Sequence, residues 1–177
     1  MELPELLSSF TAYRGRLFDV QMDELRMPNG VVAKRENLRH PGAVAMIPVA
    51  DDGRLLLVTQ YRHSAGRRLL EIPAGTLERG EDPRDAAIRE LQEEVGMKPG
   101  TVQAMGGLFV APGYTTEYIH LFVCTNLVPS QLEADEDEDL DVHPTTVAEA
   151  LAAIDSGEIC DAKSVVGILR WLRSAGR

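Results

Sequence analysis

The sequence predicts an α/β protein: a sandwich of helices on a mixed β-sheet, with an extra antiparallel sheet at the N-terminus. Three observations support this fold class. Strand-like runs separated by turn residues occupy most of residues 17–61 and return at residues 102–127. A helical segment lies between the two groups of strands, and two further helical segments follow them. Because strands and helices do not alternate strictly, we expect a mixed sheet.

Two hairpins are predicted before the first helix. The first joins residues 17–27 to residues 31–38 through a Pro-Asn-Gly turn, and both runs alternate partly between apolar and polar residues. The second joins apolar runs at residues 43–49 and 54–61 through an Asp-Asp-Gly turn. Apolar strands of this kind suit a buried sheet, so we expect the second hairpin in the core.

The first helix is predicted at residues 83–95. Asp82 is a suitable N-cap, Pro83 takes the first helical position, and Gly96 is the expected stop. Strands then follow at residues 102–110 and 118–127, and helices at residues 146–157 and 162–175. These elements complete the expected sandwich.

Composition and charge exclude several classes of function. The net charge of −10 argues against non-specific nucleic-acid binding, which depends on neutralising phosphates. No apolar run approaches the ~20 residues of a membrane span, and the N-terminus lacks a secretory signal. Cys124 and Cys160 have no metal-ligand spacing and suggest no disulfide framework, so a cytoplasmic location fits best.

The first helix carries an unusual group of acidic residues. Glu90, Glu93 and Glu94 fall within roughly 100° of one another around the helix axis. No lysine follows Glu90 by four residues, and Glu94 stands there as a like-charge neighbour. One interpretation is a solvated helix face. The other is a site for a hard divalent cation such as Mg²⁺, which prefers carboxylates and waters.

Residues 75–97 read GTLERGEDPRDAAIRELQEEVGM, and this stretch resembles the Nudix box at every defined position. The matching positions are Gly75, Glu81 and the run RELQEEVG at residues 89–96. The resemblance implies a Nudix hydrolase: an α-β-α sandwich that cleaves a nucleoside diphosphate linked to another moiety, with Mg²⁺ or Mn²⁺ as cofactor. A pyrophosphate repels an attacking water, and a divalent cation neutralises that charge.

The resemblance also implies a role for each residue of the motif. The implied metal ligands, directly or through water, are Glu90, Glu93 and Glu94, together with the carbonyl of Ala74. Glu93 is also among the candidate catalytic carboxylates. Glu81 and Arg89 are expected to hold the loop to the helix, and Gly75 to let the backbone turn.

Residues outside the motif resemble the ADP-ribose pyrophosphatase subgroup. Pro112 lies sixteen residues after Gly96, where a proline of that subgroup shapes the adenosine side of the pocket. In QYRHSAGRRLLEIPAG, Arg62 is expected to touch phosphate or ribose and Glu71 to lie near the pocket. The implied activity is Mg²⁺-dependent hydrolysis of ADP-ribose to AMP and ribose 5-phosphate.

The subgroup also implies a general base and a homodimer. The base is expected in the acidic run at residues 132–142, with Glu136 as the first candidate and Glu138 as the second. We assign residues 1–40 to a dimerisation sheet and residues 41–177 to the Nudix hydrolase domain. In the subgroup the N-terminal sheet contributes to the partner's pocket, and the candidates here are Phe18, Arg35 and Glu36.

Two other functions remain open. The first is a pyrophosphatase for another nucleoside diphosphate sugar, such as GDP-mannose or a UDP-sugar, which Pro112 does not exclude. The second is a regulatory sensor that binds ADP-ribose or nucleotides without cleaving them. Such sensors typically lose residues of the motif, whereas this chain keeps them. The expected partners are therefore a small-molecule substrate and a second copy of the chain, with no nucleic acid and no membrane.

Overall fold

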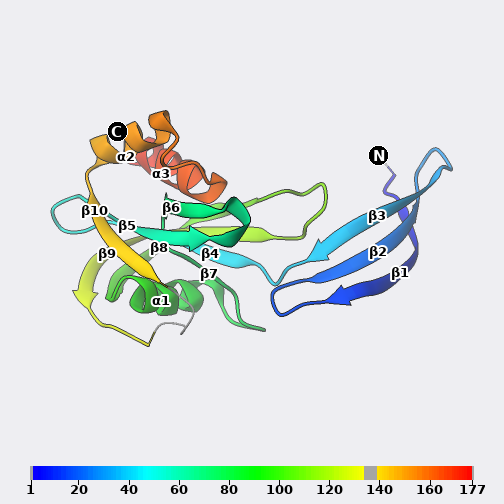
Figure 1. Ribbon diagram of the computed structural model, residues 1–177, viewed down its shortest axis with the longest axis horizontal. Coiled ribbons are helices and arrows are strands. Elements are labelled where there is room, and N and C mark those ends of the chain that lie inside the picture. Colours follow the sequence, from blue (N-terminus) through cyan, green and yellow to red (C-terminus); the bar gives the residue numbers. More distant parts are fainter. Residues whose placement is uncertain (1, 134–138, 177) are drawn as a thin grey trace. The chain divides into compact units, whose positions relative to one another are not determined.

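The computed structural model describes residues 2–133 and 139–176 (Figure 1). The chain divides into two compact units. The N-terminal unit comprises Met1–Gly42 together with Phe109–Tyr118, and the main unit comprises Ala43–Leu108 and Ile119–Arg177. The segment Phe109–Tyr118 therefore belongs with the N-terminal sheet, although it is distant from it in sequence.

The N-terminal unit is built on a three-stranded antiparallel sheet in the order β1-β2-β3. Its strands are β1 (Glu5–Arg14), β2 (Asp19–Arg26) and β3 (Val32–Arg39). The predicted hairpin is confirmed as β2 and β3, whereas β1 was not expected. Figure 1 shows the three strands side by side.

The segment Phe109–Tyr118 is attached to the end of β3 through Leu38. The Leu38 amide donates to the Tyr114 carbonyl at 2.8 Å, and the Thr116 amide donates to the Leu38 carbonyl at 2.9 Å. The His40 amide donates to the Thr116 hydroxyl at 2.9 Å. These bonds satisfy backbone groups at an edge that would otherwise need water.

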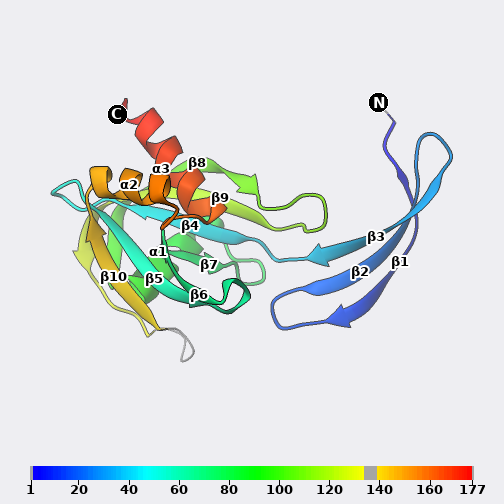
Figure 2. The ribbon, with the colours of Figure 1, turned by 45° about the horizontal axis from the view of Figure 1, so that its top comes forward.

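The main unit contains two sheets, with strand orders β7-β4-β9-β8 and β10-β5-β6. The first is formed by β4 (Ala43–Pro48), β7 (Ala74–Thr76), β8 (Met97–Phe109) and β9 (Tyr118–Pro129). The second is formed by β5 (Leu55–Arg62), β6 (Arg67–Glu71) and β10 (Leu140–Thr145), seen together in Figure 2. Because β4 is parallel to β9 and antiparallel to β7, the sheet is mixed, as predicted.

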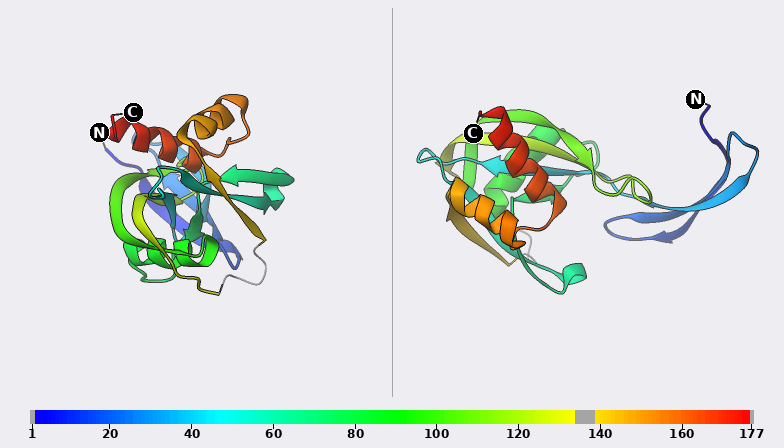
Figure 3. Two further views of the ribbon diagram at one scale, coloured as in Figure 1. Left: turned by 90° about the vertical axis from the view of Figure 1, so that its left-hand side faces the viewer. Right: turned by 90° about the horizontal axis from the view of Figure 1, so that it is seen from above.

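Helices cover the sheets on two sides. They are α1 (Pro83–Glu94), α2 (Val147–Ser156) and α3 (Ala162–Ser174), with a short 3₁₀ helix at His63–Ala65. Figure 3 shows α1 on one side of the strands and α2 with α3 on the other. The predicted α-β-α sandwich is confirmed. No helix in the described part of the chain is both long enough and apolar enough to cross a membrane.

Strand β4 is apolar throughout because both of its faces are buried. Val44 and Met46 are fully buried against the residues of α1, whereas Ala45 and Ile47 are fully buried in the cluster that contains Trp171 of α3. Successive side chains of a strand point to opposite faces, so a strand covered by helices on both sides must be apolar throughout.

Two expectations about the strands were wrong. Residues 43–49 and 54–61 share a turn, in which the Ala50 amide donates to the Arg54 carbonyl at 2.9 Å, but they do not form an extended hairpin. After the bridge between Val49 and Leu55 the two strands enter different sheets. No strand was predicted within the acidic run at residues 132–142, yet its last residues begin β10, which pairs with the buried strand β5.

Candidate active site

Helix α1 determines the positions of the acidic residues. The residues at its two ends determine where the helix begins and ends. The Asp82 side chain accepts from the Arg84 amide at 2.8 Å, and Pro83 occupies the first turn. The helix ends at Glu94, and Gly96 follows with a φ of 71°, a conformation that glycine adopts at little cost. The predicted cap, start and stop of this helix are confirmed.

The carboxylates of α1 do not form a solvated face. Glu90 is only 8% exposed and Glu94 only 6% exposed, whereas Glu93 is half-buried. Burial of a charged group is costly unless partners compensate for the lost water. Two buried glutamates one helical turn apart therefore favour the binding-site interpretation over the surface one.

Both buried carboxylates meet strand β7. Glu94 Oε2 accepts from the Ala74 amide at 3.0 Å. The carboxylate of Glu90 lies directly over Gly75, so that a Cβ atom at residue 75 would overlap it. Gly75 lies within the strand rather than at a turn with positive φ, which corrects our expectation about its role. The residue is required because it leaves room for Glu90.

Arg89 connects the loop before the helix to the acidic residues of the helix. Its guanidinium forms two hydrogen bonds with Glu81, at 2.9 and 3.0 Å, and ion pairs with Glu90 and Glu93, both at 2.8 Å. The hydrogen bond from Arg89 holds the pKa of Glu81 below its usual value, although burial opposes the shift. These contacts fit the role in holding the loop to the helix that the motif implied.

The donor chemistry fits a divalent cation. Among residues 2–133 and 139–176, no three His, Cys, Asp or Glu side chains converge closely enough to form a complete metal site. Mg²⁺, however, is usually held by one or two carboxylates and completes its shell with waters and substrate phosphates. Glu90 and Glu94 supply two such carboxylates beside β7, and Glu93 lies on the same helix, where Arg89 pairs with both Glu90 and Glu93.

A second charged group lies at the end of strand β5. Arg62 donates to Glu71 through Nε at 3.1 and 3.2 Å and through Nη2 at 2.6 Å. Glu71 is only 2% exposed. Burial lowers the pKa of Arg62, but the hydrogen bond and charge of Glu71, with the charge of Glu94, raise it overall. Arg62 therefore remains a cation within the electrostatic field of the buried glutamates.

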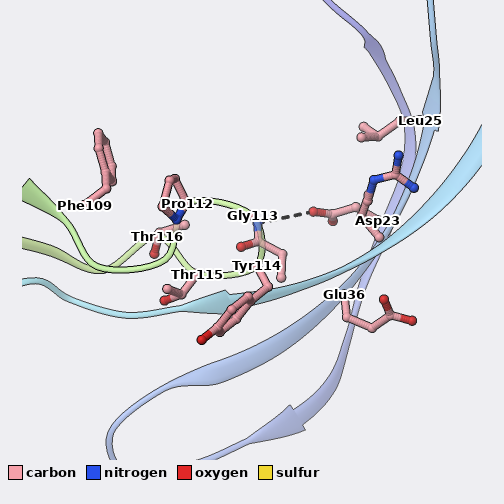
Figure 4. Close-up of a pocket in the computed structure, with 11 residues that line it drawn as sticks. Asp23, Leu25, Glu36, Phe109, Pro112, Gly113, Tyr114, Thr115 and Thr116 are labelled. Atoms are coloured by element: carbon pink, nitrogen blue, oxygen red, sulfur yellow. Dashed lines mark hydrogen bonds between the residues drawn. The ribbon is translucent and has the colours of Figure 1, made fainter. Parts of the chain in front are cut away.

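The N-terminal unit contains a pocket of about 520 Å³ (Figure 4). Its lining residues are Asp23, Leu25, Arg35, Glu36, Asn37, Phe109, Pro112, Gly113, Tyr114, Thr115 and Thr116. The pocket brings together three predicted substrate-binding residues, Arg35, Glu36 and Pro112, but Phe18 does not line it. The contribution of Asp23 and Tyr114 was not predicted, because no local sequence pattern links Phe109–Tyr118 to this sheet.

The two candidates for the general base, Glu136 and Glu138, lie outside the described residues. The residues before them are attached to α1: the Leu132 amide donates to the Gln92 carbonyl at 3.2 Å, and Gln131 Nε2 donates to the Glu93 carbonyl at 3.0 Å. After them, Arg68 of β6 forms ion pairs with Asp139 and Asp141, at 2.8 and 3.0 Å.

Known proteins resemble this chain over most of its length. The model of the NUDIX domain matches residues 39–164. An ADP-ribose pyrophosphatase of Bacillus subtilis is 37% identical over 158 residues, which cover 88% of this chain and 85% of the relative. A methanol dehydrogenase activator of Bacillus methanolicus is 40% identical with the same coverage. A crystal structure of an ADP compounds hydrolase matches with a TM-score of 0.88 and 29% identity, covering 100% of this chain and 98% of that one.

Proposed function

This chain belongs to the NUDIX family, and we propose that it hydrolyses the pyrophosphate bond of ADP-ribose to AMP and ribose 5-phosphate with Mg²⁺ or Mn²⁺. The observation that carries the proposal is the pair of buried carboxylates, Glu90 and Glu94, that meet the backbone at Ala74 and Gly75. The names of the Bacillus subtilis relative and of the ADP compounds hydrolase support the substrate. The name of the Bacillus methanolicus relative states no substrate.

Each residue of the site has a separate role in the proposed reaction. Glu90, Glu93 and Glu94, with the Ala74 carbonyl, would hold the cation, which would neutralise charge on the pyrophosphate. Arg62 binds a phosphate oxygen with the part of its guanidinium that Glu71 does not use. A carboxylate takes the proton of the attacking water, with Glu136 as first candidate and Glu138 and Glu93 as alternatives. Arg89 holds Glu90 and Glu93 in place.

A substrate panel tests the proposal. ADP-ribose, GDP-mannose and a UDP-sugar would each be incubated with Mg²⁺ or Mn²⁺, and the phosphate monoesters formed would be detected with a coupled phosphatase. Preferred cleavage of ADP-ribose supports the proposal. Preferred cleavage of another nucleoside diphosphate sugar corrects the substrate. Tight binding of ADP-ribose in calorimetry without AMP formation identifies a sensor, and cleavage of none of these compounds refutes the hydrolase.

Pro112→Ala is expected to reduce discrimination between ADP-ribose and GDP-mannose more than it reduces turnover. Proline fixes φ near −65° and so holds the loop that lines the pocket, but it does no chemistry. The measurement is the ratio of kcat/KM for the two substrates. Pro28→Ala, at an exposed turn of the same unit, serves as the control. An unchanged ratio in Pro112→Ala would remove Pro112 from the selectivity of the pocket.

We propose that the N-terminal sheet mediates a homodimer. Strand β1 exposes Leu6, Phe10 and Tyr13, and a second copy of the chain would remove such apolar side chains from water. Deleting residues 1–38 is therefore expected to give a monomer or an insoluble chain with little activity. Light scattering on the intact and shortened proteins provides the measurement. An intact protein that is monomeric at micromolar concentration would contradict the proposal.

A further inference from the structure

Four charged side chains form a compact group where β5, β6 and α3 meet. Glu71 Oε2 accepts from Arg62 Nη2 at 2.6 Å and from Lys163 Nζ at 2.7 Å. The same Lys163 Nζ donates to Asp161 Oδ2 at 2.9 Å. All of these residues belong to the main unit, and Glu71 and Lys163 lie 92 positions apart in the sequence.

Lys163 occupies a position that local structure does not favour. It lies in the first turn of α3, where the helix dipole disfavours a positive charge. The helix does not need it as a cap, because the Asp161 side chain already accepts from the Ser164 amide at 3.1 Å. Its side chain is only 11% exposed, so it also loses most of its contact with water. The compensation comes from Glu71 and Asp161.

The Glu71 carboxylate fixes which edge of Arg62 remains available. Glu71 occupies Nε and Nη2 of Arg62, whereas Nη1 makes no hydrogen bond to any residue of the described ranges 2–133 and 139–176. The Arg62 side chain is 36% exposed. The planar guanidinium of this partly exposed side chain therefore has one edge held by Glu71 and further donors left for another ligand, an arrangement suited to a phosphate oxygen.

Lys163 determines whether the Glu71 carboxylate can hold one edge of Arg62. With Lys163 present, two cations face the two carboxylates of Glu71 and Asp161. Without it, a single cation faces the buried carboxylate of Glu71 and the partly buried carboxylate of Asp161, whose Oδ1 already has no hydrogen-bond partner in the described part of the chain. Repulsion between the carboxylates then favours movement of Glu71, and Arg62 must move with it because Glu71 holds its Nε and Nη2.

The same turn of α3 supports the connection between β6 and β7. The Ser164 hydroxyl accepts from the Ile72 amide at 2.9 Å, and Ser164 is fully buried. Ile72 lies between Glu71, which holds Arg62, and Ala74, whose amide donates to Glu94. Displacement of this turn would therefore reach both the cationic and the acidic parts of the site.

We propose that Lys163 is a positioning residue, which holds the Glu71 carboxylate so that Arg62 presents its free edge to the pyrophosphate of the substrate. This inference rests on the proposed function for the identity of the substrate. It assigns the phosphate-binding geometry of Arg62 to a residue of α3, which reaches Arg62 through Glu71.

The test measures binding of two diphosphates that the enzyme does not cleave, α,β-methylene-ADP and imidodiphosphate, by calorimetry in the presence of Mg²⁺. Lys163→Met is expected to weaken both about tenfold, since a displaced charge-assisted hydrogen bond costs about 1.4 kcal/mol or more. Lys163→Arg keeps the charge and is expected to stay within about threefold of wild type. Lys98→Met makes the same change at an exposed lysine and is the control.

A double-mutant cycle separates positioning from a loss of stability. If Lys163 acts through Arg62, the double variant Lys163→Met/Arg62→Met should bind the diphosphates no more weakly than Arg62→Met alone. Independent losses that add would overturn the inference, because they would show a general structural effect. Glu71→Gln removes the intermediate carboxylate and is expected to weaken binding as Lys163→Met does. It also replaces that variant if Lys163→Met does not fold.

Kinetics and binding distinguish failure of the inference from failure of the proposed function. With whichever nucleoside diphosphate derivative the wild type cleaves, Lys163→Met should raise KM about tenfold and change kcat by less than about threefold, as expected for a loss of substrate binding. If the wild type binds the probes but cleaves nothing, the proposed function is refuted. The double-mutant cycle on probe binding then still tests the positioning role of Lys163. A wild type that binds neither probe, or a Lys163→Met variant that binds both normally, overturns the inference.

Discussion

Glu90→Gln and Glu94→Gln are each expected to lower kcat for ADP-ribose by about two to three orders of magnitude, because each removes a charged ligand of the cation, whose charge stabilisation is worth several kcal/mol. Glutamine keeps the length of glutamate and nearly its helix propensity, so α1 should form as in the wild type. The measurement is the initial rate of AMP formation at saturating Mg²⁺ or Mn²⁺. Binding of Mn²⁺, followed by its paramagnetic signal, should weaken in parallel.

Controls show whether the loss concerns the site or the fold. Glu158→Gln makes the same change at an exposed glutamate of the main unit and should retain wild-type activity. Thermal unfolding without metal should be nearly unchanged, or slightly improved, because the repulsion between Glu90 and Glu94 is relieved. Full activity in Glu90→Gln would refute the metal assignment, even though membership of the family would stand.

The elements that could be predicted are those whose sequence patterns lie within the element or next to it. Helix α1 could be placed because Asp82, Pro83 and Gly96 mark its ends within a few residues of the helix itself. Strand β4 could be placed because burial on both faces makes it apolar at every position. The acidic residues of the site belong to this same short stretch of chain, so their spacing was readable.

The parts that were missed depend on distant partners. Strand β1 was missed because most of its side chains are exposed and show no apolar period. Strand β10 was missed because its acidic neighbours resemble a loop, and only pairing with β5 makes it a strand. Lys163 was not among the predicted site residues. Its one available signal was its place in the first turn of α3, where a lysine is unfavourable.

Gly75→Ala is expected to reduce kcat by about one to two orders of magnitude, because displacement of a catalytic group by about 1 Å can cost that much. The added methyl group would overlap the Glu90 carboxylate, so Glu90 must leave its place over β7. Since Gly75 does not adopt positive φ, backbone strain makes no contribution, and the effect comes from the side chain alone. The measurement is kcat for ADP-ribose together with the midpoint of thermal unfolding.

Gly100→Ala is the control for Gly75→Ala. It distinguishes the general effect of an added methyl group in a strand from its specific effect on the Glu90 carboxylate. Gly100 lies in β8, and a Cβ there would approach Asn126 Cβ and its carbonyl oxygen at 3.0 and 3.1 Å. Gly100→Ala should therefore lower the unfolding midpoint while leaving kcat unchanged. Glu90→Asp in the Gly75→Ala background shortens the carboxylate by one methylene group and should recover stability. If Gly75→Ala lost stability only, as Gly100→Ala does, Glu90 would not need its place over Gly75 for the reaction.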